Sequence, residues 1–235
     1  MKKCYLLVII CLSAFYGRAQ ENKPTVKKKN WLTENVKEKY EVLKSDHKTK
    51  EGLYEAIYTG TNTVIARGHY ENDEKVGIWY FWDIHERLIE AFNYTNNRLL
   101  SEEPVNAVSR QYIWYAFDQP LRDSDRITKP LRIGGRCFGY IPYLQIFRLS
   151  KDYGNIDLRF LNATLEILVS PGGRLADLKV HIIAPDNSDN VTSFSPNIFS
   201  EKDKEFIPAT INGKPVMSRI FLACQITYDG TLDVE

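Results

Sequence analysis

The four histidines are the side chains of this sequence that could act as a general acid, a general base or a metal ligand near neutral pH. They are His47, His69, His85 and His181. His47 and His85 lie in polar stretches that are typical of turns, whereas His69 and His181 lie in strand-like runs. No serine, cysteine or carboxylate stands at a spacing that would pair with the two strand histidines for catalysis. We therefore expect structural histidines and a protein that is not an enzyme.

Phosphate, metal and nucleic-acid chemistry has equally little support. Acidic residues gather at positions 71–74 and 186–203, where solvated turns and helix caps explain them better than a metal site. Gly134-Gly135 and Gly172-Gly173 lack the third glycine or the Lys-Ser/Thr that a phosphate-binding loop requires. The formal net charge is only +1 over 235 residues, which gives no field that attracts nucleic acid. We expect no metal, no cofactor and no nucleic-acid partner.

The N-terminus has the layout of a secretory signal peptide. Lys2 and Lys3 precede a nearly uncharged stretch from Cys4 to Tyr16, and small residues flank a cleavage position after Ala19. The apolar stretch is shorter than the roughly 20 residues of a membrane span, although an uncleaved anchor is the alternative. We expect residues 1–19 to be removed, residues 20–36 to form a polar tail, and the protein to be exported to the periplasm.

Two cysteines remain after this cleavage, Cys137 and Cys224. An exported compartment permits a disulfide between them. The alternative is a pair of buried thiols, which pack as small apolar side chains. Cys224 falls on the inward face of a predicted strand, and this position favours the thiols.

Short strand-like runs with a repeat follow from residue 37. Gly52-Leu53-Tyr54 recurs 25 residues later as Gly77-Ile78-Trp79, and Tyr70 recurs as Tyr94. Such a period predicts an array of β-hairpins. On these residues, the segment resembles the bacterial variant of the MORN repeat. The resemblance implies an antiparallel β-hairpin repeat module, which we place at residues 37–128.

Four consecutive aromatic residues stand in this module: Trp79, Tyr80, Phe81 and Trp82. A strand places two of them on each face. An exposed pair could stack on a glycan or contact a protein, whereas packing inside the module is the alternative.

A hairpin signal stands near the C-terminus. Asn212-Gly213 predicts a type I′ turn, and Pro215 must then lie at the start or edge of a strand because it has no N–H to donate. The following strand, residues 216–227, alternates apolar residues with a mixed outer face. That outer face carries Arg219, Phe221, Ala223 and Gln225.

Two further strands and a helix are expected upstream of this turn. Apolar residues alternate on both sides of Pro171-Gly172-Gly173, which predicts a hairpin. Phe194, Ile198 and Phe199 stand at helical spacing after it. The expected order is therefore strand, strand, helix, strand.

Residues 129–235 resemble the C-terminal domain of TonB-type proteins. The motifs that carry the resemblance are Ile133-Gly134-Gly135, Tyr143-Leu144, and the sequences SPGGRLADLKV and FIPATINGKPV. The resemblance implies a small α+β domain. It also implies that the last strand, if it is an edge, captures a peptide from an outer-membrane transporter by main-chain pairing.

The expected fold is therefore mainly β, with an antiparallel β-hairpin repeat sheet followed by a small α+β domain. The expected function is that of a non-enzymatic binding or adaptor protein of the Gram-negative cell envelope. Its partner would be an envelope protein or peptide, with the outer membrane as one source. The alternatives are a protein that binds cell-wall glycan, such as peptidoglycan, an envelope enzyme or enzyme inhibitor that uses the aromatic surface, and a structural spacer.

Overall fold

The computed structural model describes residues 23–106, 109–153 and 157–234, and its fold is mainly β. The predicted signal peptide lies outside the described residues, so its cleavage stays a prediction. Within the described ranges, no helix is long and apolar enough to cross a membrane.

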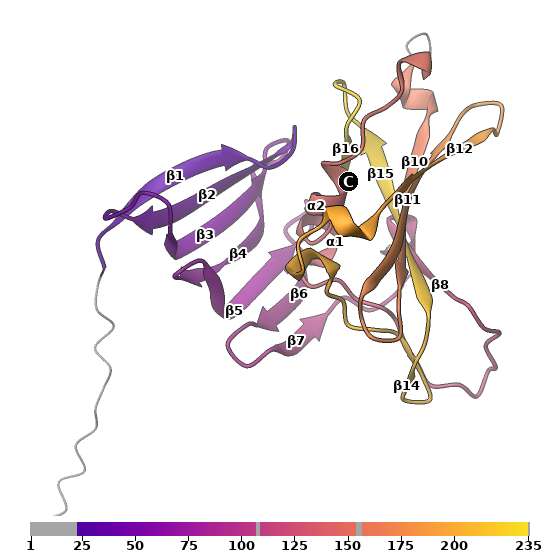
Figure 1. The fold of residues 1–235 in the computed structure, drawn as a ribbon, viewed down its shortest axis with the longest axis horizontal. Coiled ribbons are helices and arrows are strands. Elements are labelled where there is room, and N and C mark those ends of the chain that lie inside the picture. The colour runs from indigo at the N-terminus through magenta and orange to yellow at the C-terminus, as the bar shows by residue number, and fades with distance from the viewer. Residues whose placement is uncertain (1–22, 107–108, 154–156, 235) are drawn as a thin grey trace, which may run out of the picture.

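Seven antiparallel strands form the N-terminal sheet, in which each strand pairs with the next in the chain (Figure 1). These strands are β1 (Thr25–Trp31), β2 (Val36–Leu43), β3 (Lys50–Tyr58), β4 (Thr63–Glu71), β5 (Glu74–Trp82), β6 (Leu88–Asn93) and β7 (Arg98–Glu102). This meander has the antiparallel hairpin architecture expected from the repeat. The Gly-x-aromatic triplets stand in equivalent strands, β3 and β5.

The first strand of this sheet was expected to be a polar tail. β1 pairs with β2 along its whole length, from Thr25 opposite Leu43 to Trp31 opposite Lys37. The prediction of a tail is therefore wrong for residues 25–31. An edge strand can remain solvated on most of its surface, and its lysines hide the strand from a search for apolar alternation.

The C-terminal sheet has the strand order β12-β11-β10-β15-β16, with β8 also paired to β15. Its strands are β8 (Ile113–Phe117), β10 (Asn162–Val169), β11 (Leu175–Ile183), β12 (Asp189–Phe194), β15 (Ser218–Ile226) and β16 (Leu232–Val234). A small third sheet contains β9 (Ile127–Thr128), β13 (Thr210–Ile211) and β14 (Lys214–Pro215). The predicted boundary at residue 128 thus falls after β8, a strand that already belongs to the C-terminal sheet.

Helical structure is confined to short pieces. Between the two sheets lie α1 (Gly135–Phe138) and α2 (Ile141–Leu144), as Figure 1 shows. Within the described ranges, five single turns of 3-10 helix accompany them: η1 (Ser109–Gln111), η2 (Lys151–Tyr153), η3 (Leu158–Phe160), η4 (Pro196–Ile198) and η5 (Lys202–Lys204).

The predicted helix after the second C-terminal strand is wrong. Residues 189–194 form the strand β12, and only the turns η4 and η5 follow. Ser195 caps η4 through its hydroxyl, which accepts a hydrogen bond from Asn197 N at 3.3 Å. Phe199 then returns to extended backbone at φ −94° and ψ 151°. The helical spacing of the phenylalanines was therefore coincidental.

The predicted turn at Asn212-Gly213 is confirmed. The two residues have φ values of 53° and 77°, as a type I′ turn requires, and they connect β13 to β14. Pro215 ends this hairpin in the short strand β14, at the place expected for a residue without an N–H.

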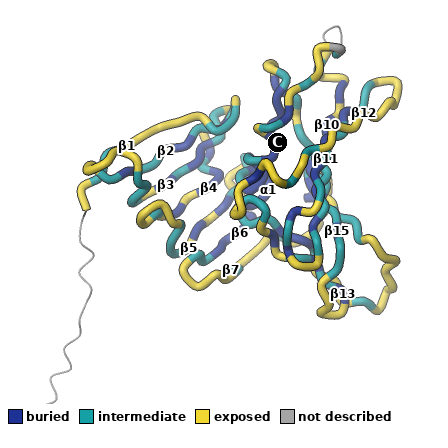
Figure 2. Tube along the Cα trace, in the orientation of Figure 1, coloured by how far each residue is buried: buried dark blue, intermediate teal, exposed yellow. Residues whose placement is uncertain are grey.

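A single hydrophobic core joins the two sheets. One cluster of buried side chains includes Trp79 and Phe81 from the N-terminal sheet, Tyr143 from α2, and Leu165 and Ile220 from the C-terminal sheet. Figure 2 shows the buried segments along the region where the two sheets approach each other. The two expected modules therefore share their core.

Glycine residues at α1 allow this close approach. The N–H groups of Gly134 and Gly135 donate to the two carboxylate oxygens of Glu90, at 2.8 and 3.1 Å. The φ values of these glycines are 128° and 63°. Beside them, Arg136 donates to buried Asp83 at 3.0 Å. A buried carboxylate on the N-terminal sheet thus holds the start of α1.

Glu90 makes stability depend on pH. Burial raises the pKa of Glu90 to about 7, from an ordinary value of 4.5, although the hydrogen bonds from Gly134 and Gly135 act in the opposite direction. The folded state therefore holds a proton that the unfolded state releases between pH 4.5 and 7. Its contribution to stability is present at acidic pH and is lost as the pH rises toward 7.

We expect the unfolding free energy of the wild type, measured relative to that of Glu90→Gln, to fall by about 2 kcal/mol from pH 5 to pH 8. Urea unfolding of both proteins across this range measures the difference. The exposed Glu201→Gln serves as a control and should leave the pH dependence in this range unchanged. Parallel pH profiles for the wild type and Glu90→Gln would show that Glu90 does not titrate in this range.

Candidate binding surfaces

The last long strand is not an edge. β15 pairs with β10 on one side, from Ala163 opposite Cys224 to Val169 opposite Ser218. On its other side, it pairs with β8 over residues 218–222 and with β16 over residues 224–226. The prediction that this strand receives a peptide is therefore wrong, because the chain itself occupies both of its sides.

The four outer-face residues of β15 are engaged within the molecule in different ways. The N–H of Ala223 donates to the carbonyl of Tyr112 at 2.8 Å and is therefore not free to pair with a partner. The Phe221 ring stacks on Trp114 with centroids 5.6 Å apart and planes 7° apart. Gln225 lies on the exposed part of the strand.

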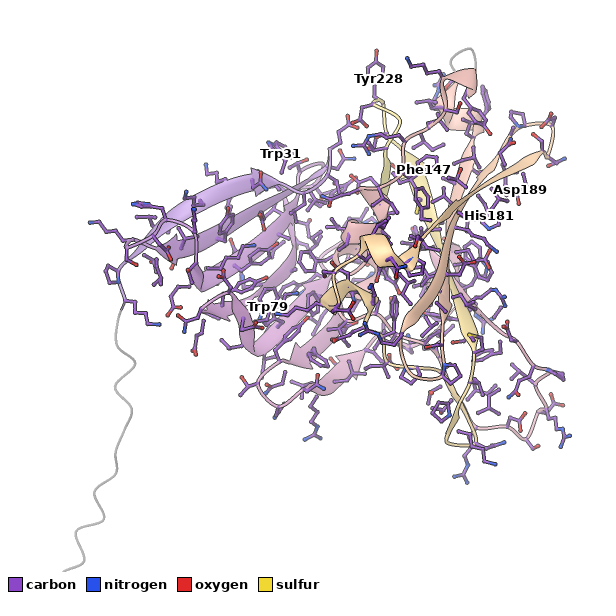
Figure 3. The ribbon with its side chains drawn as sticks, in the orientation of Figure 1. Trp31, Trp79, Phe147, His181, Asp189 and Tyr228 are labelled. Carbon is purple, nitrogen blue, oxygen red and sulfur yellow. The ribbon has the colours of Figure 1, made fainter. Side chains whose placement is uncertain are left out.

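Arg219, the fourth of these residues, is part of a chain of charges. Its guanidinium donates to Glu166 at 2.9 Å and also pairs with Asp118. The other oxygen of Glu166 lies 2.8 Å from His181 Nε2, and His181 Nδ1 lies 2.9 Å from Asp189. The chain thus crosses β15, β10, β11 and β12 on the outer face of the C-terminal sheet. Figure 3 shows His181 and Asp189 side by side near the end of β12.

This charge network was not predicted from the sequence. Glu166 and Asp189 stand 15 and 8 residues from His181, and only strand pairing brings them together. Burial lowers the pKa of His181, but the hydrogen bonds to Asp189 and Glu166 outweigh it, and the net pKa is raised. Because both ring nitrogens face carboxylates, the imidazolium form is favoured and neither nitrogen is left to act as a general base. The expectation that no carboxylate pairs with this histidine is therefore wrong, and the two pairs favour a structural role for His181.

The aromatic run in β5 divides between the two faces of the N-terminal sheet. Trp79 and Phe81 are fully buried, whereas Tyr80 is 39% exposed and Trp82 is half-buried. Figure 3 shows Trp79 within the side chains of this sheet. The predicted two-and-two division is confirmed. Any surface contact is restricted to Tyr80 and Trp82, whose ring centroids lie 6.0 Å apart.

Of the cysteines in the described residues, Cys137 and Cys224, neither forms a disulfide. Cys137 is buried and Cys224 is half-buried. Burial raises the pKa of each thiol to about 12, which makes them poor nucleophiles at neutral pH. The prediction of buried thiols is thus supported for Cys137 and in part for Cys224.

One edge of the C-terminal sheet is open. β12 pairs with β11 from Ile183 opposite Asp189 to Leu178 opposite Phe194, without a shift in register. No strand that the structure describes pairs with its other side. Five of its six residues are exposed, and Figure 2 shows β12 and the turn before it largely in the colour of exposed residues.

The register identifies which backbone groups of β12 face outward. Ala184 N donates to Ser188 O at 3.0 Å, so these two residues form a hydrogen-bonded pair at the turn. Hydrogen-bonded and non-hydrogen-bonded pairs alternate along an antiparallel ladder. The N–H and C=O groups of Asp189, Val191 and Ser193 therefore point away from β11, toward the open edge.

Two lysines occupy aromatic cages on the N-terminal sheet. Lys50 Nζ lies 4.6 Å from the ring centroid of Tyr40 and 5.2 Å from those of Tyr54 and Tyr70. A second cage, one repeat later, surrounds Lys75. Lys75 Nζ lies 4.6, 5.1 and 5.2 Å from three ring centroids, those of Trp79, Tyr94 and Phe138. Two rings of each cage are one repeat apart, Tyr54 with Trp79 and Tyr70 with Tyr94, whereas the third ring of the second cage, Phe138, comes from α1.

No group of three or more metal-ligating side chains gathers in the part of the chain that the structure describes. No family model, no curated protein and no solved structure matches the chain. The open edge of β12, the ring pair of Tyr80 and Trp82, and the two lysine cages are therefore the surfaces whose geometry bears on function.

Proposed function

We propose that this protein is a non-enzymatic binding protein of the bacterial cell envelope, which captures an extended segment of an envelope protein along the open edge of β12. The signal-peptide pattern and the resemblance to TonB-type C-terminal domains support the envelope location. The single observation that carries the proposal is the row of unpaired backbone groups at Asp189, Val191 and Ser193. Main-chain pairing with such an edge is a general way of recognising an extended peptide.

β12 differs from the other edges in lacking protection. β1 carries Lys27, Lys28 and Lys29, and charged side chains of this kind oppose edge-to-edge pairing. β7 and β8 have five residues each, and β16 has three. β12 has six residues with no lysine and no proline, and its Val191 side chain is 49% exposed. An added strand would extend the C-terminal sheet and cover this valine.

The test compares two substitutions at one position. Val191→Pro removes an N–H that faces the open edge, while the ladder to β11 keeps its hydrogen bonds, so the fold should survive. Val191→Thr keeps the N–H and a β-branched shape. We expect a photo-crosslinking residue at Ser193 to give the same envelope-protein adduct in the wild type and in Val191→Thr, and at least about tenfold less in Val191→Pro.

Circular dichroism of Val191→Pro establishes that the variant is folded. An equally strong adduct in folded Val191→Pro would rule out main-chain pairing at β12. An adduct of twice the mass of the chain would instead identify a second copy of this protein as the occupant, and the proposed envelope partner would be wrong.

A glycan-binding function has a narrower basis. Tyr80 and Trp82 form the only part of the aromatic run on the outer face, and two neighbouring rings can stack on a sugar. Sedimentation with peptidoglycan tests this alternative: Trp82→Ala should weaken binding if the rings hold the glycan, whereas Val191→Pro should not.

A further inference from the structure

A cleft of about 780 Å³ lies between the N-terminal sheet and the C-terminal half of the chain. Tyr70, Lys75 and Tyr94 line it from the sheet, and Arg132, Lys202 and Phe206 line it from the other side. Lys75 is therefore a caged lysine that also faces a cavity. The cleft is separate from the open edge of β12.

The first caged lysine has a built-in counter-charge. Lys50 Nζ lies 3.3 Å from a carboxylate oxygen of Glu38, which is 5% exposed. In the register of β2 and β3, Glu38 stands opposite Ala56. Ala56 in turn lies two residues after the cage residue Tyr54. The carboxylate and the three rings together enclose the ammonium group of Lys50.

The second caged lysine lacks this counter-charge. In the second cage, the residue that lies two positions after the cage residue Trp79 is Phe81. The position in β4 that corresponds to Glu38 is therefore the one opposite Phe81. Ala66 occupies that position. Within the described residues, Lys75 forms no salt bridge, and its hydrogen-bond partner is the Tyr94 hydroxyl at 3.4 Å. The repeat thus keeps the aromatic cage and omits the acid of β4. Glu90 of β6 also stands opposite Phe81, but its two carboxylate oxygens accept hydrogen bonds from the N–H groups of Gly134 and Gly135.

The other cationic side chains that line the cleft are already paired with carboxylates. Arg132 pairs with Asp203 at 3.0 Å, Lys202 with Glu74 at 2.7 Å, and Arg174 with Glu205 at 3.8 Å. Lys75 is therefore the lining cation that no salt bridge of the described residues engages. An added anion with a single charge would pair with it, whereas a dianion would bring an extra negative charge close to the carboxylates of the cleft, which include Asp73.

We propose that Lys75 is the anchor of an anion-binding site that takes the carboxylate of a small molecule with an aromatic or apolar body. The carboxylate would take the place that Glu38 holds beside Lys50. The body would lie along the apolar wall of the cleft, which includes Phe92, Leu99, Ile133 and Ile207. Such a combination of one charged anchor and an apolar wall is typical of small-molecule sites.

The protonation of Lys75 supplies an independent readout. Burial, with a further contribution from the positive charges of Arg132 and Lys50, lowers the pKa of Lys75 to about 7, although Asp203 and Glu90 act in the opposite direction. A bound carboxylate would favour the charged amine and raise its pKa. Binding above pH 7 should therefore take up a proton from the solvent.

Isothermal titration of the full protein with benzoate at pH 8 tests the site. We expect benzoate to bind and the uncharged benzamide not to bind, and heats measured in two buffers of different ionisation enthalpy should reveal proton uptake. We expect Lys75→Met to bind benzoate at least about tenfold more weakly. Lys202→Met removes a lysine of the same cleft that is already paired, and it should bind benzoate as the wild type does.

Several outcomes would overturn the proposal. They are an absence of benzoate binding, equal binding of benzoate and benzamide, unchanged binding by Lys75→Met, and tighter binding of inorganic phosphate than of benzoate. An absence of proton uptake by the wild type would also overturn it, and this measurement does not depend on how the variants fold.

Discussion

Replacement of Gly68 by alanine should lower the unfolding free energy by about 3 kcal/mol, at the upper end of the range for overpacked cores. A methyl group at this position would lie 2.2 Å from Cδ2 and Cε2 of Trp79. Trp79 is fully buried, and its indole N–H donates to the carbonyl of His69 at 3.2 Å. Either the ring or the strand must therefore move.

The surroundings of Trp79 leave the ring little room to move. Tyr54, Tyr70 and Tyr94 lie with ring centroids 5.2 to 5.7 Å from it. A displaced indole would also disturb the cage of Lys75, which lies 4.6 Å above the ring. Since a packed interior transmits such shifts rather than absorbing them, the cost should be distributed over the whole aromatic cluster.

Urea unfolding of the full chain measures this effect. Gly172→Ala is the matched control, because a methyl group there meets only Ser170 Oγ at 3.8 Å and the change should stay within about 0.5 kcal/mol. The double variant Gly68→Ala/Trp79→Phe should lose less stability than the sum of the two single changes, because the smaller ring makes room for the methyl group. Additive losses would show that Gly68 and Trp79 do not compete for the same space.

Gly134→Ala should destabilise the protein by a similar amount, about 3 kcal/mol or more, for a different reason. Gly134 has a φ of 128°, which side chains rarely allow, and an added methyl group would lie 2.5 Å from Cα of Gly139. The methyl group would be fixed to the backbone at Gly134, and the atom it meets is a backbone atom of the same tight turn. No side chain can therefore rotate to relieve the contact. The substitution would also disturb the N–H that donates to Glu90 at 2.8 Å.

The loss should appear as a single unfolding transition of lower midpoint, since the two sheets share one core. Near-ultraviolet circular dichroism follows the buried aromatic residues during this transition. The same control, Gly172→Ala, has no positive φ and no close contact. A loss below about 1 kcal/mol for Gly134→Ala would mean that the start of α1 can rearrange without separating from the N-terminal sheet.

Local features of the sequence determined much of the secondary structure. Asn212-Gly213 specifies its turn because few other residue pairs accept two positive φ values. The run Trp79 to Trp82 must divide between two faces, because successive side chains of a strand point in opposite directions. The 25-residue repeat likewise predicts hairpins, since each hairpin needs only neighbours in the chain to form its hydrogen bonds.

The hairpin of β10 and β11 was predicted from the turn at Pro171-Gly172-Gly173 and is confirmed, whereas the neighbours of β15 were decided by the tertiary structure alone. The alternation in β15 identifies a strand with one buried face, but it does not say what lies beside the strand. β8 fills one side from about 100 residues upstream, and it reads in the sequence as one more strand of the repeat. The same non-local pairing, of β15 with β10, brings Arg219 to Glu166. Within hairpins of consecutive strands, the register places Glu166 and Asp189 beside His181 and puts Ala66 rather than an acid opposite Phe81. A local sequence pattern predicts which face of a strand a residue occupies. It does not predict which strand pairs with each edge, or which charged side chain then lies beside the residue.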